Sequence, residues 1–317
     1  MVALLNFKRP APPQASVTLA PDLEAFLNGY SIEVMPRTAR KVQDFRALLP
    51  ENTRVYIAHI EGTPIRDMVA TARRLAHDGY NVMPHFPARL IKDKATLQDM
   101  IARYQGEAGV DQALVLAGGP RTPHGEFESS MQLMETGLFD KAGFKHLHVA
   151  GHPEGNRDID PDGGEAMVMK ALRWKQAFRE RTDAAMAIVT QFAFGAGPVV
   201  AWANRLAAEG VTLPIHIGIA GPAKLQTLIT FAIACGVGPS LDVLQKRARD
   251  VTKLLLPYEP IDILTQLATH KATIPDFNIE RVHFFPLGGI ATNARWAIDH
   301  GGASTRPAAS AQAQGSP

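Results

Sequence analysis

The amino-acid sequence predicts an α/β protein, a (β/α)8 TIM barrel in which a parallel eight-stranded barrel carries extra helices before strand 8. Two observations predict this class: eight short β-prone runs alternate with longer helical stretches, and no obvious hairpin joins two of the runs. A third observation is that no GxGxxG turn occurs in the chain. Its absence disfavours the open doubly wound sheet, which is the alternative architecture.

The candidate strands occur at intervals along the whole chain. In order they are 30–34 (YSIEV), 54–59 (RVYIAH), 81–85 (NVMPH), 113–117 (ALVLA), 146–150 (HLHVA), 187–192 (AIVTQF), 214–219 (PIHIGI) and 281–285 (RVHFF). The intervening segments carry helix signals. For example, "TPIRDMVATARRLAHDG" opens with Thr-Pro and closes on Gly. The interval from 220 to 280 holds two additional helical segments, "SLDVLQKRARDVTKLLL" and "PIDILTQLATH".

Composition divides the chain into one domain and two loosely held ends. Residues 1–20 are predicted to be a flexible N-terminal segment, because residues 8–16 are rich in Pro and Ala. Residues 302–317 are predicted to be a disordered tail, because they have almost no apolar side chain larger than Ala that could offset ordering entropy. Residues 21–301 then form a single barrel domain. This length agrees with barrels that fill about 250 residues as one domain.

Charge and cysteine content limit the classes of partner. The net charge is +2, from 33 basic and 31 acidic residues, which gives no strong electrostatic attraction to nucleic acid or acidic lipid. No apolar run reaches the roughly 18 residues of a membrane helix. The single cysteine, Cys235, lies in the apolar run "TFAIACGVG", where burial is expected, and one cysteine excludes an internal disulfide. These features predict a cytoplasmic protein with a small-molecule partner, no nucleic acid and no membrane. A homo-oligomer stays open.

The carboxyl ends of barrel strands form the active site, so the residues there are the informative ones. They are Glu33, His59, His85, the segments 117–125 (AGGPRTPHG) and 151–158 (GHPEGNRD), Gln191, and the segments 218–222 and 284–289.

Three interpretations of these strand-end residues compete. The histidines, with His146 and His148 on one face of a strand, could hold zinc, although HExxH and cysteine pairs are absent. The glycine-rich loops could bind phosphate or could be tight turns. A nucleophile is disfavoured because no GxSxG occurs.

Glu33 is the one carboxylate at the end of the first strand. Its neighbours in "YSIEVMPR" are apolar apart from Arg37 and Ser31. Glu33 is therefore either a functional acid in the barrel mouth or a surface residue paired with Arg37, and the strand-end position favours the mouth.

Seven strand-end segments, taken in order, resemble one known family. They are "SIEVMPRTA", "VMPHF", "LVLAGGP", "VAGHPEG", "IVTQFAF", "IHIGIAGP" and "VHFFPLGG". Together they are similar to methylenetetrahydrofolate reductase, a flavin-dependent (β/α)8 barrel family, over residues 28 to 300. The order of the motifs on the strands carries the resemblance, since no single motif is specific.

The resemblance implies an oxidoreductase of one-carbon metabolism and methionine biosynthesis. NADH or NADPH would reduce bound FAD, and the flavin would transfer a hydride between 5,10-methylenetetrahydrofolate and 5-methyltetrahydrofolate. Glu33 corresponds to the catalytic general acid of the family, which protonates a folate nitrogen. With apolar neighbours and a covering flavin, the pKa of Glu33 is expected to rise towards neutrality.

The resemblance also assigns binding residues. Gln191 corresponds to the glutamine that holds the pterin or the nicotinamide amide, and Leu287 and Phe285 lie at substrate-binding positions. Lys175 corresponds to a lysine near the FAD phosphates, although its spacing to Gln191 differs from that of the family. The implied cofactor-binding residues are His59, His85, Ala117, Gly118, Gly119, His152, Glu154 and Lys175.

The chain departs from the family pattern on strand four. The family has Arg-Gly-Asp where this chain has Ala117, Gly118 and Gly119. Loss of the aspartate removes a negative charge near the flavin and is predicted to raise the flavin potential, which leaves the reaction direction open and favours oxidation of 5-methyltetrahydrofolate as a hypothesis. Two alternatives stay open: a folate-binding or methyl-transfer-associated barrel without flavin redox activity, and a metal-dependent barrel hydrolase.

Overall fold

The structure is a computed structural model that describes residues 21–236, 243–245, 256–274 and 276–302. Residues 1–20 and 303–317, for which flexible ends were predicted, lie outside the described residues, as does most of the predicted helix "SLDVLQKRARDVTKLLL". The predicted domain bounds therefore stay a prediction.

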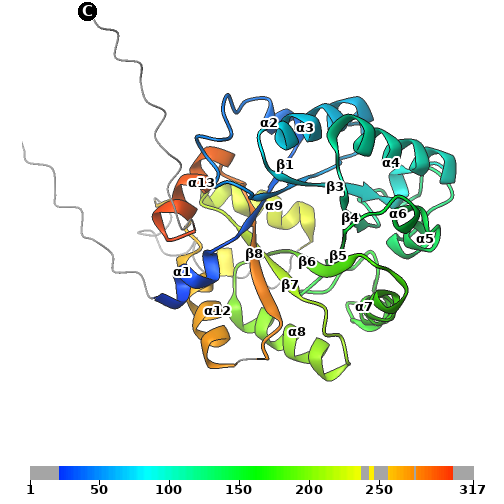
Figure 1. The fold of residues 1–317 in the computed structure, drawn as a ribbon. Coiled ribbons are helices and arrows are strands. Elements are labelled where there is room, and N and C mark those ends of the chain that lie inside the picture. The colour runs from blue at the N-terminus through cyan, green and yellow to red at the C-terminus, as the bar shows by residue number, and fades with distance from the viewer. Residues whose placement is uncertain (1–20, 237–242, 246–255, 275, 303–317) are drawn as a thin grey trace, which may run out of the picture.

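Eight parallel strands close into a barrel in chain order, with β8 pairing back to β1 (Figure 1). The predicted fold class is confirmed, and each strand bound lies within two residues of its predicted position. The strands are β1 (Ser31–Val34), β2 (Arg54–Ile57), β3 (Asn81–Pro87), β4 (Gln112–Leu116), β5 (His146–Gly151), β6 (Ala185–Ala193), β7 (Ile215–Ala220) and β8 (Ile279–Phe285).

The helices surround the strands, as Figure 1 shows. They are α1 (Pro21–Leu27), α2 (Pro36–Ala39), α3 (Ile65–His77), α4 (Lys94–Ala108), α5 (Ser130–Glu135), α6 (Leu138–Lys141), α7 (Ala166–Phe178), α8 (Ala196–Ala208), α9 (Leu225–Cys235), α12 (Ile261–Thr273) and α13 (Ile290–Asp299). Asp93 caps α4 by accepting a hydrogen bond from the Thr96 backbone N–H at 2.7 Å, and Gly109 ends it at φ 62°. The presence of α12 confirms an extra helix before β8.

The main core lies between the outer faces of the strands and the helices. Ile32 and Val34 of β1 are fully buried in it, together with large side chains such as Trp202 of α8 and Phe86 of β3. Because successive strand residues point to opposite faces, Ser31 and Glu33 point into the barrel. The apolar neighbours of Glu33 in the sequence thus belong to the outer core and do not surround its carboxylate.

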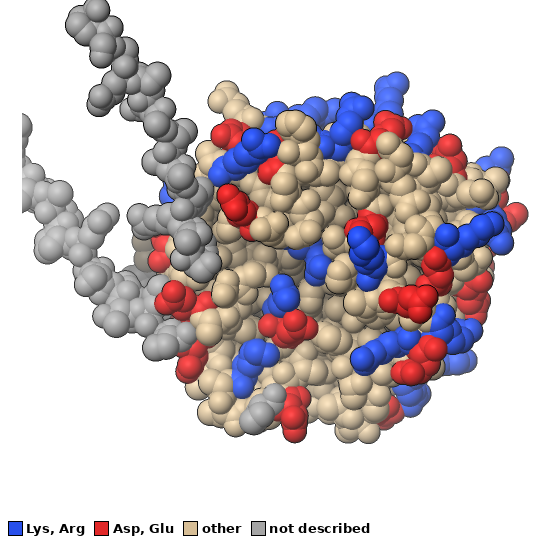
Figure 2. Space-filling model, in the orientation of Figure 1, with Lys and Arg blue, Asp and Glu red and all other residues tan. Residues whose placement is uncertain are grey.

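The surface carries interspersed charge. On the face shown in Figure 2, Lys and Arg side chains alternate with Asp and Glu, without an extended area of one sign. Within the described part of the chain, every helix is too short or too polar to cross a lipid bilayer. The predicted burial of Cys235 is wrong, because this residue ends α9 beyond its last buried residue, Ala232, and is exposed.

Candidate functional site

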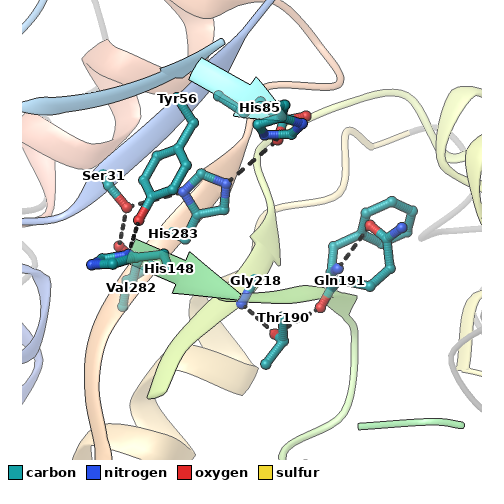
Figure 3. A network of polar contacts seen from close by, with 11 residues as sticks. Ser31, Tyr56, His85, His148, Thr190, Gln191, Gly218, Val282 and His283 are labelled. Atoms are coloured by element: carbon teal, nitrogen blue, oxygen red, sulfur yellow. Dashed lines mark hydrogen bonds and ion pairs between the residues drawn. The ribbon is translucent and has the colours of Figure 1, made fainter. Parts of the chain in front are cut away.

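The barrel interior is filled by polar aromatic side chains. The Tyr56 hydroxyl lies 2.7 Å from Nδ1 of His148. The ring of Tyr56 packs edge-on against His283 at a centroid distance of 4.5 Å, and His148 packs against His216 at 4.9 Å. All four residues are buried. Figure 3 shows three of them, Tyr56, His148 and His283. This layer closes the floor beneath the strand ends.

The imidazoles of this layer are neutral. Burial lowers the pKa values of His148 and His216 well below the usual range, and the cationic side chain of Arg54 lowers them further. Arg54 enters from the opposite end of the barrel, where its Nε donates to Gln112 Oε1 at 3.0 Å. The positive charge of Arg54 at this end of the barrel therefore disfavours protonation of the histidines in the interior.

Glu33 lies above this layer and contacts two histidines. Its Oε2 is 3.2 Å from Nε2 of His85 on β3 and 3.8 Å from Nε2 of His283 on β8. The Glu33 side chain is 19% exposed, whereas that of His283 is fully buried. Glu33 therefore points into the barrel mouth towards imidazoles, so its ion-pair contacts come from other strands and not from Arg37.

The pKa of Glu33 in this structure moves opposite to the direction expected for a carboxylate beneath a covering flavin. Burial does favour the protonated carboxyl, but His283 and His85 outweigh burial and lower the pKa of Glu33 to about 2. At neutral pH the carboxylate is ionised. It is ready to accept a proton, whereas donation requires that the proton first be delivered to it.

The cofactor candidates occupy consecutive strand ends. His59 follows β2, His85 lies in β3, Ala117–Gly119 follow β4, and His152 and Glu154 follow β5. One buried ring nitrogen in this group, His59 Nδ1, has no hydrogen-bond partner, whereas Nε2 of His85 contacts Glu33. Burial lowers the pKa of His59, so its ring is neutral and its unpartnered nitrogen can meet a ligand group. One side of the mouth thus gathers all the strand-end residues assigned to cofactor binding.

Lys175 of α7 brings a buried amine behind the end of β5. Its Nζ donates to the carbonyl of Ala150 at 3.4 Å, and the residue is only 6% exposed. Burial lowers the pKa of Lys175 to about 8, and burial together with Lys175 lowers the pKa of His152 to about 4. A buried ammonium with one long hydrogen bond is incompletely satisfied, so an anionic group would stabilise it.

The two glycines after β4 differ in their surroundings. Gly118 has φ +96°, and a Cβ there would lie 2.9 Å from Cβ of Pro87, so only glycine fits. A Cβ on Gly119 would meet nothing within 4 Å, and its backbone is not left-handed. A side chain, including the family aspartate, can therefore be accommodated at position 119.

The substrate candidates occupy the other side of the mouth. Gln191 lies near the end of β6, where its Oε1 accepts from the backbone N–H of Phe192 at 3.2 Å. Phe285 ends β8 and packs edge-on against Phe192 at 5.4 Å, and Leu287 packs against the same apolar cluster. At the strand ends, the candidate residues of β2 to β5 are therefore mainly polar, whereas those of β6 to β8 lie beside an aromatic cluster.

Comparison with known proteins supports the fold. No model of a known protein family matches the chain. An uncharacterised protein from Clostridium thermocellum, which binds two copies of 5-methyl-5,6,7,8-tetrahydrofolic acid, superposes with a TM-score of 0.51 at 10% sequence identity, over 86% of this chain and 96% of that chain. The 7,8-dihydropteroate synthase from Vibrio fischeri ES114 superposes with a TM-score of 0.35 at 9% identity, over 86% and 93% of the two chains.

The first of these likenesses supports the barrel fold and no more. At 10% identity the Clostridium thermocellum protein shares the fold, and the Vibrio fischeri superposition is too loose to support an argument. Membership of the methylenetetrahydrofolate reductase family therefore stays a prediction.

The histidines proposed as zinc ligands have other contacts. Nδ1 of His148 lies against the Tyr56 hydroxyl, and Nε2 of His59 lies 3.0 Å from the carbonyl of Thr63. Among the described residues, no three or more His, Cys, Asp or Glu side chains are arranged to hold a metal ion.

Two site residues were missed by sequence reasoning, Ser31 and His283. Ser31 Oγ lies 3.0 Å from Nδ1 of His283. The alternation of side chains along a strand could have identified both residues. Ser31 lies two residues before Glu33 and His283 two residues before Phe285, so each shares a strand face with a predicted site residue.

Proposed function

We propose that this protein interconverts 5,10-methylenetetrahydrofolate and 5-methyltetrahydrofolate by flavin-dependent hydride transfer, with Glu33 moving the proton. The observation that carries the proposal is the position of Glu33. It lies at the end of β1, between the polar strands β2 to β5 and the aromatic strands β6 to β8, and it is partly exposed to the mouth. A proton-transfer group between a cofactor side and a substrate side suits this reaction.

The ionised state of Glu33 bears on the direction of the reaction. In the direction that forms 5-methyltetrahydrofolate, Glu33 must arrive protonated and give its proton to a folate nitrogen. In the reverse direction, Glu33 starts in the ionised form that can accept this proton, although its pKa of about 2 makes it a weak base. The preference for oxidation of 5-methyltetrahydrofolate therefore rests on the missing aspartate at Gly119.

The residues of β2 to β5 suit FAD as the cofactor. The unpartnered Nδ1 of His59 can hydrogen-bond a polar heterocycle, and the buried amine of Lys175 can neutralise a phosphate. FAD, when bound, would supply the hydride chemistry, with NADH or NADPH as the co-substrate. The protein contributes the binding groups and the proton at Glu33.

The residues of β6 to β8 suit a planar heterocycle. Gln191 provides a primary amide, which both donates and accepts, and Phe285 provides an aromatic ring within an apolar cluster. The Clostridium thermocellum protein, which shares this fold, binds 5-methyl-5,6,7,8-tetrahydrofolic acid. Both points support a folate as the ligand of this side.

The visible spectrum of the purified protein tests the proposal. A yellow protein with absorbance near the flavin band at about 450 nm, bleached by 5-methyltetrahydrofolate under anaerobic conditions, is the expected result. A flavin-loaded protein that neither 5-methyltetrahydrofolate nor NAD(P)H can bleach would contradict it.

A second candidate is a folate-binding or methyl-transfer-associated barrel without redox activity. The specific observation in its favour is Gly119, because the carboxylate that tunes flavin chemistry in the family is absent. A colourless protein that takes up no added FAD and binds 5-methyltetrahydrofolate in calorimetry is the result expected for this candidate. Stoichiometric zinc would instead indicate a metal-dependent hydrolase.

Restoring the aspartate is expected to lower the flavin potential. Gly119→Asp places a carboxylate where the structure leaves open space, so the variant should fold. A negative charge disfavours the anionic reduced flavin, and we expect a shift of roughly 30–60 mV to lower potential, equivalent to about 1.4–2.8 kcal/mol for a two-electron couple. Dye-equilibration titration measures the shift. Gly119→Asn is the neutral control, and an equal shift in both variants would exclude a charge effect.

A further inference from the structure

The end of the barrel opposite the mouth gathers basic and hydrogen-bond-donating side chains that the proposed function does not use. They are the first residues of three strands, Arg54 of β2, Gln112 of β4 and His146 of β5, together with His216 of β7 and Arg281 of β8. Gln112 pairs in register with His146, and His216 pairs with Arg281. All of them point into the barrel, because the residue that follows each one in its strand belongs to the outer core.

The side chain of Arg54 contacts uncharged partners. Its Nε donates to Gln112 Oε1 at 3.0 Å, and the Tyr56 hydroxyl also interacts with the guanidinium. The residue is half-buried. Burial lowers the pKa of Arg54, and the positive charge of Arg281 adds to this effect. A partly buried cation that meets neutral dipoles and a second cation is incompletely compensated.

The carboxylates that act on this cluster are already paired with other cations. Glu280 contacts Arg281 at 3.2 Å, and Asp111 contacts Lys145 at 2.7 Å. Both ion pairs lie largely in solvent, where such pairs are weak and screened by salt. They therefore leave the charge of Arg54 in the barrel interior without a counter-ion.

His216 and Gln112 add hydrogen-bonding capacity beside this charge. His216 is 3% exposed, and its Nδ1 has no hydrogen-bond partner. Gln112 accepts from Arg54 through its side-chain oxygen, so its amide nitrogen is left to donate. A polar ring nitrogen at this depth is costly unless another polar group meets it.

We propose that this end of the barrel binds a small oxyanion, represented by inorganic phosphate, between Arg54 and Arg281. A planar guanidinium matches two oxygens of such an anion, and Gln112, His146 and His216 are placed to donate to the others. The anion supplies the missing counter-charge and so stabilises the folded barrel. Glu33 lies at the other end of the barrel, so this site is independent of the proposed redox reaction.

Thermal unfolding of the full-length protein tests the site. Sodium phosphate is compared with sodium chloride at equal ionic strength and equal pH, because charge screening acts equally in both salts. We expect phosphate to raise Tm saturably, by roughly 3–6 °C at a tenfold excess over its Kd. Equal Tm values in the two salts would overturn the proposal.

Variants locate the bound anion. Arg54→Gln and Arg281→Gln are expected to lose the phosphate-dependent rise in Tm. Arg103→Gln on α4 should keep it, because Arg103 is 42% exposed and paired with Asp99, much as Arg281 is 45% exposed and paired. The exposed position of Arg281 makes Arg281→Gln informative even if Arg54→Gln does not fold. Retention of the rise in Arg281→Gln with its loss in Lys175→Met would place the anion at the mouth and overturn the proposal.

Histidine NMR reports contact with the anion directly. In ¹⁵N-histidine-labelled protein, phosphate is expected to move the ring signals of His146 and His216, which His146→Gln and His216→Gln identify. His77, whose side chain is 83% exposed on α3, is the matched control and should keep its signal at constant pH. Unmoved signals of both His146 and His216 at saturating phosphate would overturn the proposal.

Discussion

Glu33→Gln is expected to reduce folate turnover about 10³-fold while leaving flavin reduction by NAD(P)H unchanged. Glutamine keeps the size and polarity of the side chain but cannot carry the proton. The two half-reactions share the flavin and differ in their need for proton transfer to folate. Anaerobic stopped-flow measurement of flavin absorbance separates them, because each half-reaction can be started with one substrate alone.

The control for Glu33→Gln is the structural integrity of the barrel. Glu33 contacts His85 and His283, so its replacement could disturb either side of the mouth. Unaltered flavin content and unaltered affinity for 5-methyltetrahydrofolate in Glu33→Gln would exclude such a disturbance. If both half-reactions fell by the same factor, the assignment of Glu33 as the proton-transfer group would be wrong.

The strands could be located from the sequence because their signals are local. Each β-prone run lies between helix stop and start signals, and the end of each strand then identifies residues at the mouth. Glu33, His85 and Gln191 were placed at strand ends in this way, and the structure has them in β1, β3 and β6.

The contacts between strand ends could not be predicted in the same way. Ser31 and His283 are 252 residues apart and meet only because β8 pairs with β1 to close the barrel. The pKa of Glu33 was expected to rise because its sequence neighbours Ile32 and Val34 are apolar, but these side chains belong to the outer core. The groups that set its pKa come from β3 and β8.

Lys175→Met is expected to stabilise the protein without cofactor by about 3 kcal/mol at pH 7. The pKa of Lys175 is lowered to about 8 in the folded state from 10.5 in the unfolded state, because burial penalises the ammonium. Below pH 8 the folded protein carries the full cost of the buried charge. Between pH 8 and 10.5 the unfolded state binds more protons, so the wild type gains stability as the pH rises and its difference from Lys175→Met shrinks.

Urea unfolding from pH 7 to pH 10 measures this difference, with Lys170→Met on the exposed face of the same helix as the matched control. The control should change the free energy of unfolding by less than about 0.5 kcal/mol. A stability gain that does not depend on pH would mean that packing, and not the buried charge, is responsible.

The affinity of Lys175→Met for FAD tests whether the buried amine has a role in cofactor binding. If Lys175 neutralises a cofactor phosphate, Lys175→Met binds FAD more weakly and loses its advantage when FAD is saturating. Unchanged FAD affinity would leave the lysine as an uncompensated buried charge and would remove it from the cofactor site.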